Sequence, residues 1–206
     1  MQRDRVERQA LPPLGTAELP RSPSAVEPTL QRRVRLSGRW LAPRTVFLDN
    51  RQMDGKPGFY VVTPLLLGTA DGADAVLVQR GWAPRNFAER AALPAFETAT
   101  GVVSIDGRIA ASPSRMFEFA SQASGAIRQN IDRDAFAHET QLDLLPVTVV
   151  QIDTPGARPD GLSRHWTEPA VDVQKHYGYA VQWFAIAVLI GALYVRHRFL
   201  RPRHSH

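Results

Sequence analysis

The 206-residue sequence contains no cysteine and only two lysines. The absence of cysteine excludes disulfide bonds, cysteine-ligated zinc and thiol catalysis. The sequence also has no G-x-S-x-G nucleophile elbow and no glycine-rich phosphate loop. The acids Asp49, Asp54, Asp71 and Asp74 fall in or beside predicted turns, where capping of the backbone explains them. With no catalytic constellation in view, we do not expect an enzyme.

Because lysine is scarce, the formal net charge of +5 comes from arginine. A basic protein can bind nucleic acid. Here, however, seven arginines lie in the first 35 residues and four in the last eleven. Those positions favour contacts with anionic lipid over a folded nucleic-acid surface. We therefore expect a lipid membrane as a partner, and no nucleic acid.

One long segment lacks formal charge altogether, the nineteen residues YGYAVQWFAIAVLIGALYV at 177–195. At about 1.5 Å per residue it is close to the ~30 Å hydrocarbon core of a bilayer. Tyr177, Tyr179 and Trp183 gather at one end and Tyr194 lies at the other, as expected at two membrane interfaces. The alternative, a buried helix of a soluble protein, rarely stays charge-free beside so basic a flank. The sequence therefore predicts one C-terminal transmembrane helix.

The basic tail indicates that the C-terminus is cytoplasmic and that the preceding domain lies outside the cytoplasm. A domain in that position needs an export signal or an earlier helix, yet residues 1–30 contain no apolar core. Either the domain is cytoplasmic, or a first membrane span precedes Met1 in the natural protein.

The middle of the chain predicts short strands. Val34, Leu36 and Trp40 alternate with arginine and serine, and β-branched or aromatic runs follow at 45–51, 58–67, 74–82 and 147–153. We expect turns at Asp71-Gly72 and at Asp106-Gly107, a short helix opened by Asn86, and a helix from Asp132 to about Thr140.

The fold class that follows is mainly β with short α, a small antiparallel sheet or barrel-like domain followed by the transmembrane helix. We divide the chain into a charged, proline-rich N-terminal segment, a β-rich extracytoplasmic domain, a linker, the membrane helix and a basic cytoplasmic tail, at residues 1–32, 33–153, 154–175, 176–195 and 196–206.

His176 directly precedes the charge-free segment. On a helix it shares a face with Tyr179, Ala180 and Trp183. An imidazole beside aromatic and small side chains suits axial ligation of haem iron, with Tyr179 and Trp183 packing against the macrocycle. The alternative is an interfacial histidine that bonds water or lipid head groups. His138 and His165 are predicted to be surface or loop residues.

A second candidate set is Asn50, Arg51, Arg80 and Trp82. Arginines at the ends of adjacent strands can bind an anion or a protein partner in bidentate fashion. Alternatively, Arg51 and Arg80 pair with Asp49 or Glu89 and cap the sheet. The residues alone leave both readings open.

Four ordered blocks carry a family resemblance. They are VRLSGRWL, TVFLDNR followed by GKPGFYVVTPLLL, AVLVQRGWAP, and KHYGYAVQWFAIA. Read together they resemble the Surf1 family of cytochrome oxidase biogenesis factors, over roughly residues 34–195. Gln79 and Tyr177 stand where asparagine and leucine are commoner in the family.

The resemblance implies a non-enzymatic assembly factor of the bacterial inner membrane, with two membrane helices around a periplasmic domain. It implies subunit I of cytochrome c oxidase and other oxidase assembly factors as partners. It also implies transient binding of haem a, with His176 as the candidate ligand of the haem iron, the only metal expected. The alternative is a protein–protein scaffold that stabilises subunit I without haem. The first family helix is absent here, so we expect about twenty apolar residues encoded upstream of Met1.

Overall fold

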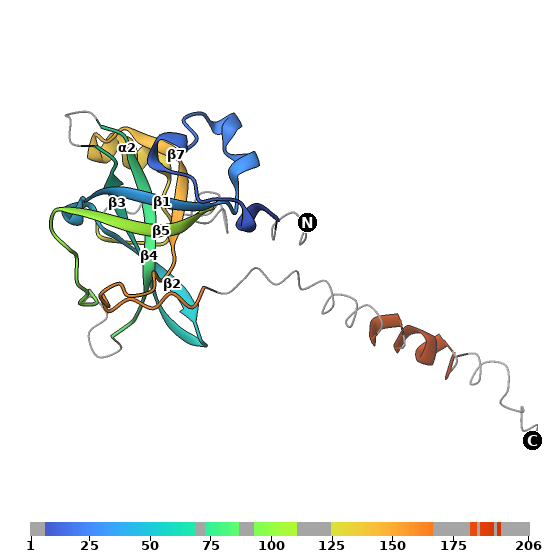
Figure 1. Cartoon of the computed structure of the whole chain (residues 1–206). Coiled ribbons are helices and arrows are strands. Elements are labelled where there is room, and N and C mark those ends of the chain that lie inside the picture. The colour runs from blue at the N-terminus through green and yellow to red at the C-terminus, as the bar shows by residue number, and fades with distance from the viewer. Residues whose placement is uncertain are drawn as a thin grey trace, which may run out of the picture. The chain divides into compact units, whose positions relative to one another are not determined.

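Seven strands form the body of the protein in the part that the computed structural model describes, residues 7–68, 73–86, 93–110, 125–166, 182–184, 186–191 and 193–194. The strands are β1 (Arg33–Trp40), β2 (Val46–Met53), β3 (Lys56–Leu66), β4 (Ala75–Pro84), β5 (Val102–Ala110), β6 (Ile127–Arg128) and β7 (Leu144–Gln151). The helices with them are α2 (Arg133–Thr140) and the short 3-10 helices η1 (Thr16–Glu18), η2 (Pro23–Ala25), η3 (Glu27–Thr29) and η4 (Ala42–Arg44). The chain divides into two compact units, Met1–Trp166 and Thr167–His206, and all the strands belong to the first (Figure 1).

Five of the strands close into a ring. β1 pairs antiparallel with β5, β5 antiparallel with β7, β7 parallel with β4, and β4 antiparallel with β3. β3 then returns to β1 through the pairs Arg39–Leu66 and Trp40–Leu65. Within the ring, the single parallel contact joins the third and the last strands in chain order, as in five-stranded Greek-key barrels of the OB type. The predicted mainly β, barrel-like fold is thus confirmed.

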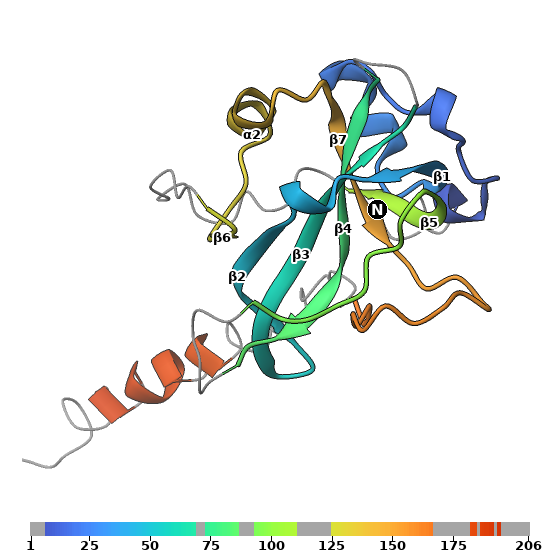
Figure 2. The same ribbon diagram turned by 90° about the vertical axis from the view of Figure 1, so that its left-hand side faces the viewer.

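Two strands extend the ring on one side. β2 pairs antiparallel with β3, to which it is joined by a two-residue turn at Asp54 and Gly55, and the short β6 runs parallel to β2. Figure 2 shows β2, β3 and β4 side by side. β3 and β4, the strands on either side of the turn expected at Asp71-Gly72, pair antiparallel.

The interior of the ring is filled by side chains from alternate residues of the strands. In β1 every second residue is buried, and Val34 and Leu36 point into the ring with at most 1% of their surface exposed. They pack with Leu65 of β3, Val76 of β4 and Val149 of β7. Burying a side chain of this size stabilises the fold by about 1.5–3 kcal/mol relative to leaving it exposed.

The proline-rich N-terminal segment also takes part in the core. Leu14 pairs with Val34 as an isolated bridge, and its backbone exchanges hydrogen bonds with Arg33 and Arg35. Leu14 and Leu19 are both buried in the same cluster that fills the ring. This segment therefore covers the stretch of β1 that β3 does not reach.

The helix expected after Asp132 is confirmed. α2 begins at Arg133, and the Asp132 carboxylate accepts a hydrogen bond from the Ala135 amide at 2.8 Å. This N-cap satisfies one of the amides that have no partner within the helix.

The turn expected at Asp106-Gly107 is wrong, because β5 runs unbroken from Val102 to Ala110. Gly107 lies so close to β7 that a Cβ there would meet the Val149 side chain at 2.5 Å and the Val150 carbonyl oxygen at 2.9 Å. The glycine therefore serves close packing between strands. The turn at Asp71-Gly72 and the helix expected after Asn86 lie outside the described residues.

Residues 182–184, 186–191 and 193–194, within the predicted membrane segment, are helical and exposed. Among the described residues, no helix is long and apolar enough to cross a membrane.

Candidate functional site

Arg80 enters the interior through a β-bulge. On β3, Val61 lies opposite Gly81 and Val62 lies opposite Gln79, so Arg80 is the extra residue on β4. A bulge of this kind redirects one side chain and bends the strand. It also marks the point where β4 leaves β7, whose last pair with it is Gln79–Val150.

The Arg80 side chain is 2% exposed. Its guanidinium lies 4.5 Å from the centre of the Trp40 ring and 5.0 Å from that of Phe96, close enough for cation–π attraction. It donates hydrogen bonds to the Thr98 hydroxyl at 2.7 Å and to the Glu97 carbonyl oxygen at 2.9 Å. Two rings and two oxygens thus replace much of the water that the cation has lost.

Asp160 supplies the opposite charge to two arginines. Its Oδ2 lies 3.4 Å from Nη2 of Arg80 and 2.5 Å from Nη2 of Arg164. Arg164 also donates to the Arg80 carbonyl oxygen at 2.6 Å and to Asp153 at 3.1 Å. This buried ion network joins β4 to the segment that follows β7, residues 152–166, which we call the strap.

Burial lowers the pKa of the Arg80 guanidinium, and the Asp160 carboxylate opposes that shift. An arginine guanidinium is not deprotonated in proteins near neutral pH, so the side chain keeps its charge. Nε of Arg80 is buried without a hydrogen-bond partner, so the network does not satisfy every donor. Of the two readings of the sequence for Arg80, its burial favours an internal ion pair, formed with Asp160.

The other residues of the second candidate set gather around β2 and β4. Trp82 is buried, and its indole N–H donates to the Arg51 carbonyl oxygen at 3.0 Å. The Arg51 guanidinium donates to the Gln129 carbonyl oxygen at 2.9 Å and to the Asn130 side chain at 3.1 Å. Only Asn50 of the set is exposed. The structure therefore brings Arg51 and Trp82 together and places Arg80 in a separate network.

Asp49, one of the acids considered for Arg51 and Arg80, forms an ion pair with Arg85. The Arg85 guanidinium also lies over the Phe59 ring at 5.1 Å. Glu89, the other acid considered, lies outside the described residues.

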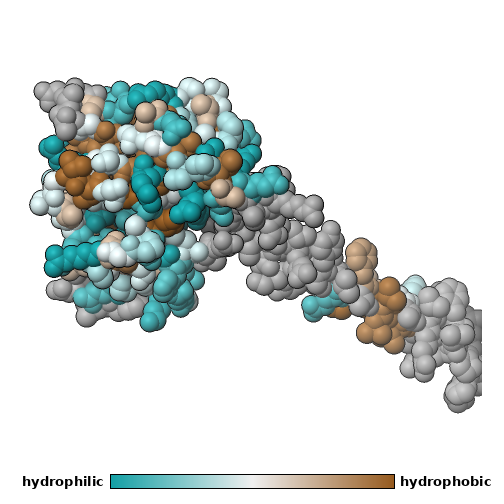
Figure 3. Space-filling view, viewed as in Figure 1, coloured by the Kyte–Doolittle hydropathy of each residue, from teal (hydrophilic) through white to brown (hydrophobic). Residues whose placement is uncertain are grey.

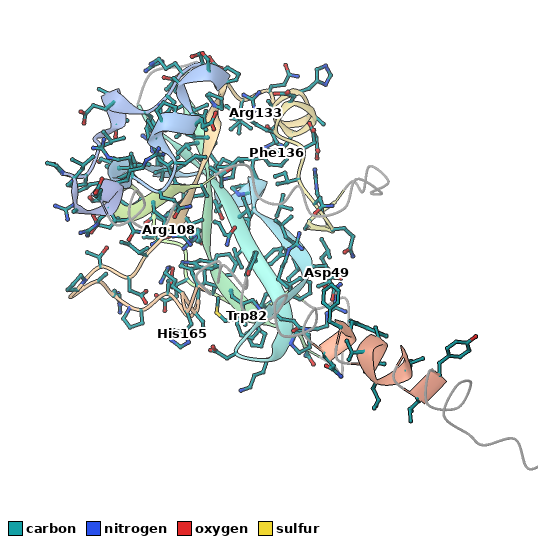
Figure 4. All side chains as sticks on the ribbon, turned by 90° about the vertical axis from the view of Figure 1, so that its right-hand side faces the viewer. Asp49, Trp82, Arg108, Arg133, Phe136 and His165 are labelled. Carbon is teal, nitrogen blue, oxygen red and sulfur yellow. The ribbon has the colours of Figure 1, made fainter. Side chains whose placement is uncertain are left out.

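The last residues of the strap, 163–166, contact the strands β4 and β7 and the turn between β2 and β3. Ser163 pairs with Trp82 of β4, and the Trp166 indole N–H donates to the Gln151 carbonyl oxygen at 2.6 Å. The imidazole of His165 lies 2.8 Å from the Asp54 carboxylate in the turn between β2 and β3. Figure 4 shows His165 near Trp82, with both at the other end of the domain from Arg133 and Phe136 of α2. His165 is exposed, in agreement with its prediction as a surface or loop residue, and so is His138 on α2.

A groove of about 410 Å³ runs along the strap. Polar side chains from the strap and from β5 and β7 line it, among them Ser104, Gln151, Thr154 and Arg158. The Gln151 side-chain oxygen is buried without a hydrogen-bond partner. The groove can accept a small polar group, and its most buried cation, Arg164, is already paired with two aspartates.

The predicted haem site falls mostly outside the described residues. His176 and Tyr179 belong to the part that is not described. Trp183 is helical and 69% exposed, which leaves its indole ring open to contact. In the described ranges, no three histidine, aspartate or glutamate side chains gather into a metal site.

Together these features define a class: a small closed β-barrel domain, braced by a buried ion network, on a chain whose C-terminal segment exposes apolar helical residues. The sequence model of the SURF1 family matches residues 1–188, and the chain belongs to this family. The family consists of assembly factors of cytochrome c oxidase, is membrane-associated in general and is not a known enzyme family. A comparison with curated proteins finds no match.

Sequence reasoning missed Asp160 and Arg164, which complete the network around Arg80. They lie in a proline- and glycine-rich stretch of the kind that predicts a connection. The local sequence gives no signal beyond the charges themselves, because their partner Arg80 lies eighty residues earlier.

Proposed function

We propose that this chain is a membrane-anchored assembly factor that assists the delivery of haem a to subunit I of cytochrome c oxidase, or the maturation of that subunit. The observation that carries this proposal is the extent of the SURF1 match. It covers the whole β domain and continues through residue 188, so it includes the segment from His176 to Trp183. The partners that follow are subunit I and other oxidase assembly factors.

In this proposal the haem is cargo. A neutral imidazole is a common axial ligand of haem iron, and His176 would provide it. Tyr179 and Trp183 would pack against the macrocycle, and the exposed indole of Trp183 supports this role. Delivery requires that the oxidase bind the haem more strongly than this chain does. The site should therefore be moderate in affinity and open on one side.

The apolar segment at 176–195 would anchor the protein. Its described residues are helical and carry exposed Phe184, Val188, Leu189 and Ile190, as a helix facing lipid requires. The basic tail would remain in the cytoplasm of a bacterium and the β domain would face the periplasm. Asn50, exposed on β2, and the neighbouring Arg51 would then offer a surface to an oxidase subunit.

Absorption spectroscopy of the purified chain tests whether it binds haem a and whether His176 is the ligand. The protein would be expressed in cells that make haem a and purified in detergent. We expect a haem a spectrum for the natural sequence and for His138→Ala, a control on the exposed face of α2. We expect His176→Ala to lose most of the absorption. Full retention in His176→Ala would contradict the assignment of the ligand.

The same preparation separates the alternative function. A scaffold that stabilises subunit I without haem would co-purify with subunit I yet show no haem absorption. That result would remove the cargo role and leave the family's role in oxidase assembly intact.

A further inference from the structure

One outer face of the ring carries a row of arginines. Along β1, Arg33, Arg35 and Arg39 point outward and are exposed, because alternate residues of a strand face opposite sides. On the neighbouring strand β5, Arg108 lies directly opposite Arg33 and so faces the same way. We call this outer surface of β1 and β5 the basic face.

The basic face has a net positive charge. β1 and β5 together contain four arginines and one acid, Asp106, which gives them a net charge of +3. Asp106 is almost buried and is held by Arg35 through bonds of 2.8 and 3.3 Å and by the Thr154 hydroxyl at 3.0 Å. The bond from Arg35 lowers the pKa of Asp106, so the acid stays ionised and engaged. Within the described part of the chain, Arg33 and Arg39 form no ion pair.

Small and apolar residues lie among these arginines. Ser37 faces Ser104 across the strand pair, and Arg39 faces Val102, which is 65% exposed. Figure 3, in the view of Figure 1, shows hydrophilic and hydrophobic side chains intermixed over the side where β1 and β5 cross the domain. Arg33 and Arg39 are exposed beside these short side chains, whereas Arg108 is half-buried and donates to the Gln31 side-chain oxygen at 2.9 Å. A cationic row beside an exposed valine matches a lipid interface, where charge and apolar surface meet within a few ångströms.

We propose that the basic face docks on the head groups of an anionic phospholipid membrane. Guanidinium groups bind phosphate oxygens in bidentate fashion, which suits a face whose cations are all arginine. Each cation close to such a surface strengthens binding by about 1 kcal/mol, or roughly fivefold. Lipid is favoured over an acidic protein because the family is membrane-associated and the same chain exposes an apolar helical segment. The inference rests on the membrane anchorage in the proposed function, but not on the binding of haem.

The absence of cysteine makes a direct test possible. Ser37→Cys places a single thiol in the middle of the basic face, to which a bimane fluorophore can be attached. The labelled full chain would be reconstituted into phosphatidylcholine vesicles with and without about 30% phosphatidylglycerol, both containing lipid with a nitroxide on its head group. We expect at least about twofold stronger quenching in the anionic vesicles, which added salt reverses.

Two double variants distinguish an effect of the basic face from an effect of the protein's net charge. Arg33→Gln with Arg39→Gln removes two cations from the basic face, and Lys56→Gln with Arg158→Gln removes two exposed cations elsewhere. We expect the first pair to abolish the extra quenching and the second pair to leave most of it. All four positions are exposed, so the variants should fold, and their thermal unfolding checks this.

Three results would overturn the proposal. Quenching could be equal in neutral and anionic vesicles, or both double variants could lose the extra quenching in anionic vesicles to the same extent. Alternatively, a polyglutamate peptide could shield the fluorophore in neutral vesicles more strongly than anionic lipid does, which would assign the face to an acidic protein. Each of these results can occur while oxidase assembly still depends on the chain, so the two proposals fail separately.

Discussion

Arg80 carries a charge in the interior of the ring, where an unpaired cation is strongly unfavourable. Trp40 and Phe96 cover its faces, and Asp160 and Thr98 bind its edge. Asp160 lies in the strap and Thr98 lies between β4 and β5, so one side chain ties three parts of the domain together. We infer that Arg80 contributes to stability through this arrangement and does not contact a partner itself.

Replacement of Arg80 by methionine should therefore be strongly destabilising. Arg80→Met keeps much of the volume but removes the cation–π contacts and leaves Thr98 and the Glu97 carbonyl oxygen without their donor. We expect the free energy of unfolding to fall by about 3 kcal/mol, measured by chemical denaturation. Arg158→Met, on an exposed residue of the strap, should change it by less than about 0.5 kcal/mol. Equal effects of the two substitutions would refute the role of the network.

The pair of His165 and Asp54 should make the end of the strap sensitive to pH. The hydrogen bond to the Asp54 carboxylate, and then its charge, raise the pKa of His165. A raised pKa means that the stabilisation is fully present below the unfolded histidine value of about 6.5 and is lost as pH rises through the folded value. Asp54→Asn should therefore lower stability at about pH 5.5 and have little effect at about pH 9. An effect of Asp54→Asn that is the same at both pH values would count against the pair.

Single residues were predictable from the sequence only where local chemistry decided their role. Asp132 is such a case, since an aspartate before a helical stretch satisfies the first amides of a helix wherever the rest of the chain goes. Arg80 is the opposite case. Its partners come from residues 40, 96–98 and 160, and the bulge that points it inward depends on how β3 and β4 pair. Nothing in the local sequence around Arg80 encodes those contacts.

At the scale of elements, closure of the ring depends on a short contact between β1 and β3. Only Arg39 and Trp40 of β1 pair with β3, at Leu66 and Leu65. Gly38 lies beside this contact, and a Cβ there would meet the Leu66 carbonyl oxygen at 2.3 Å. Because backbone atoms cannot move aside cheaply, a glycine is required where the two strands converge.

Gly38→Ala should open or strain this closure. We expect it to lower the free energy of unfolding by about 1–3 kcal/mol and to increase amide hydrogen exchange at Trp40 and Leu66. Ser37→Ala, on the exposed neighbour, should change neither measurement appreciably. Wild-type exchange at both amides in Gly38→Ala would show that the ring does not depend on this approach.

Strands were predictable from the sequence because apolar and polar residues alternate along them, as in β1, or because they contain a short apolar run, as at Ala75–Val78 in β4. The turn predicted at Asp106-Gly107 was wrong because the contacts that decide the roles of these two residues come from other strands. Asp-Gly is a frequent turn dipeptide, but here the aspartate is tied to Arg35 and the glycine accommodates β7. The contacts of the strap were not predictable either, since Ser163 pairs with a strand about eighty residues earlier.

In the whole molecule, the β domain holds the ion network and the basic face, and the C-terminal segment holds the candidate haem ligand. The described residues establish how the barrel closes, how the strap is held and where the basic face lies. The candidate haem ligand, His176, belongs to the second unit, and its assignment comes from its place before an apolar segment and from the family resemblance. Sequence therefore says more about the candidate haem site than about the proposed docking surface, which depends on which strands become neighbours.

If the chain serves the assembly of cytochrome c oxidase, cells that lack the chain should make an oxidase with a lower content of haem a. Membranes of a deletion strain would be compared with those of the same strain carrying the natural gene on a plasmid. We expect a marked loss of haem a from the oxidase, restored by the plasmid. A normal haem a content in the deletion strain would argue against a role of the chain in oxidase assembly.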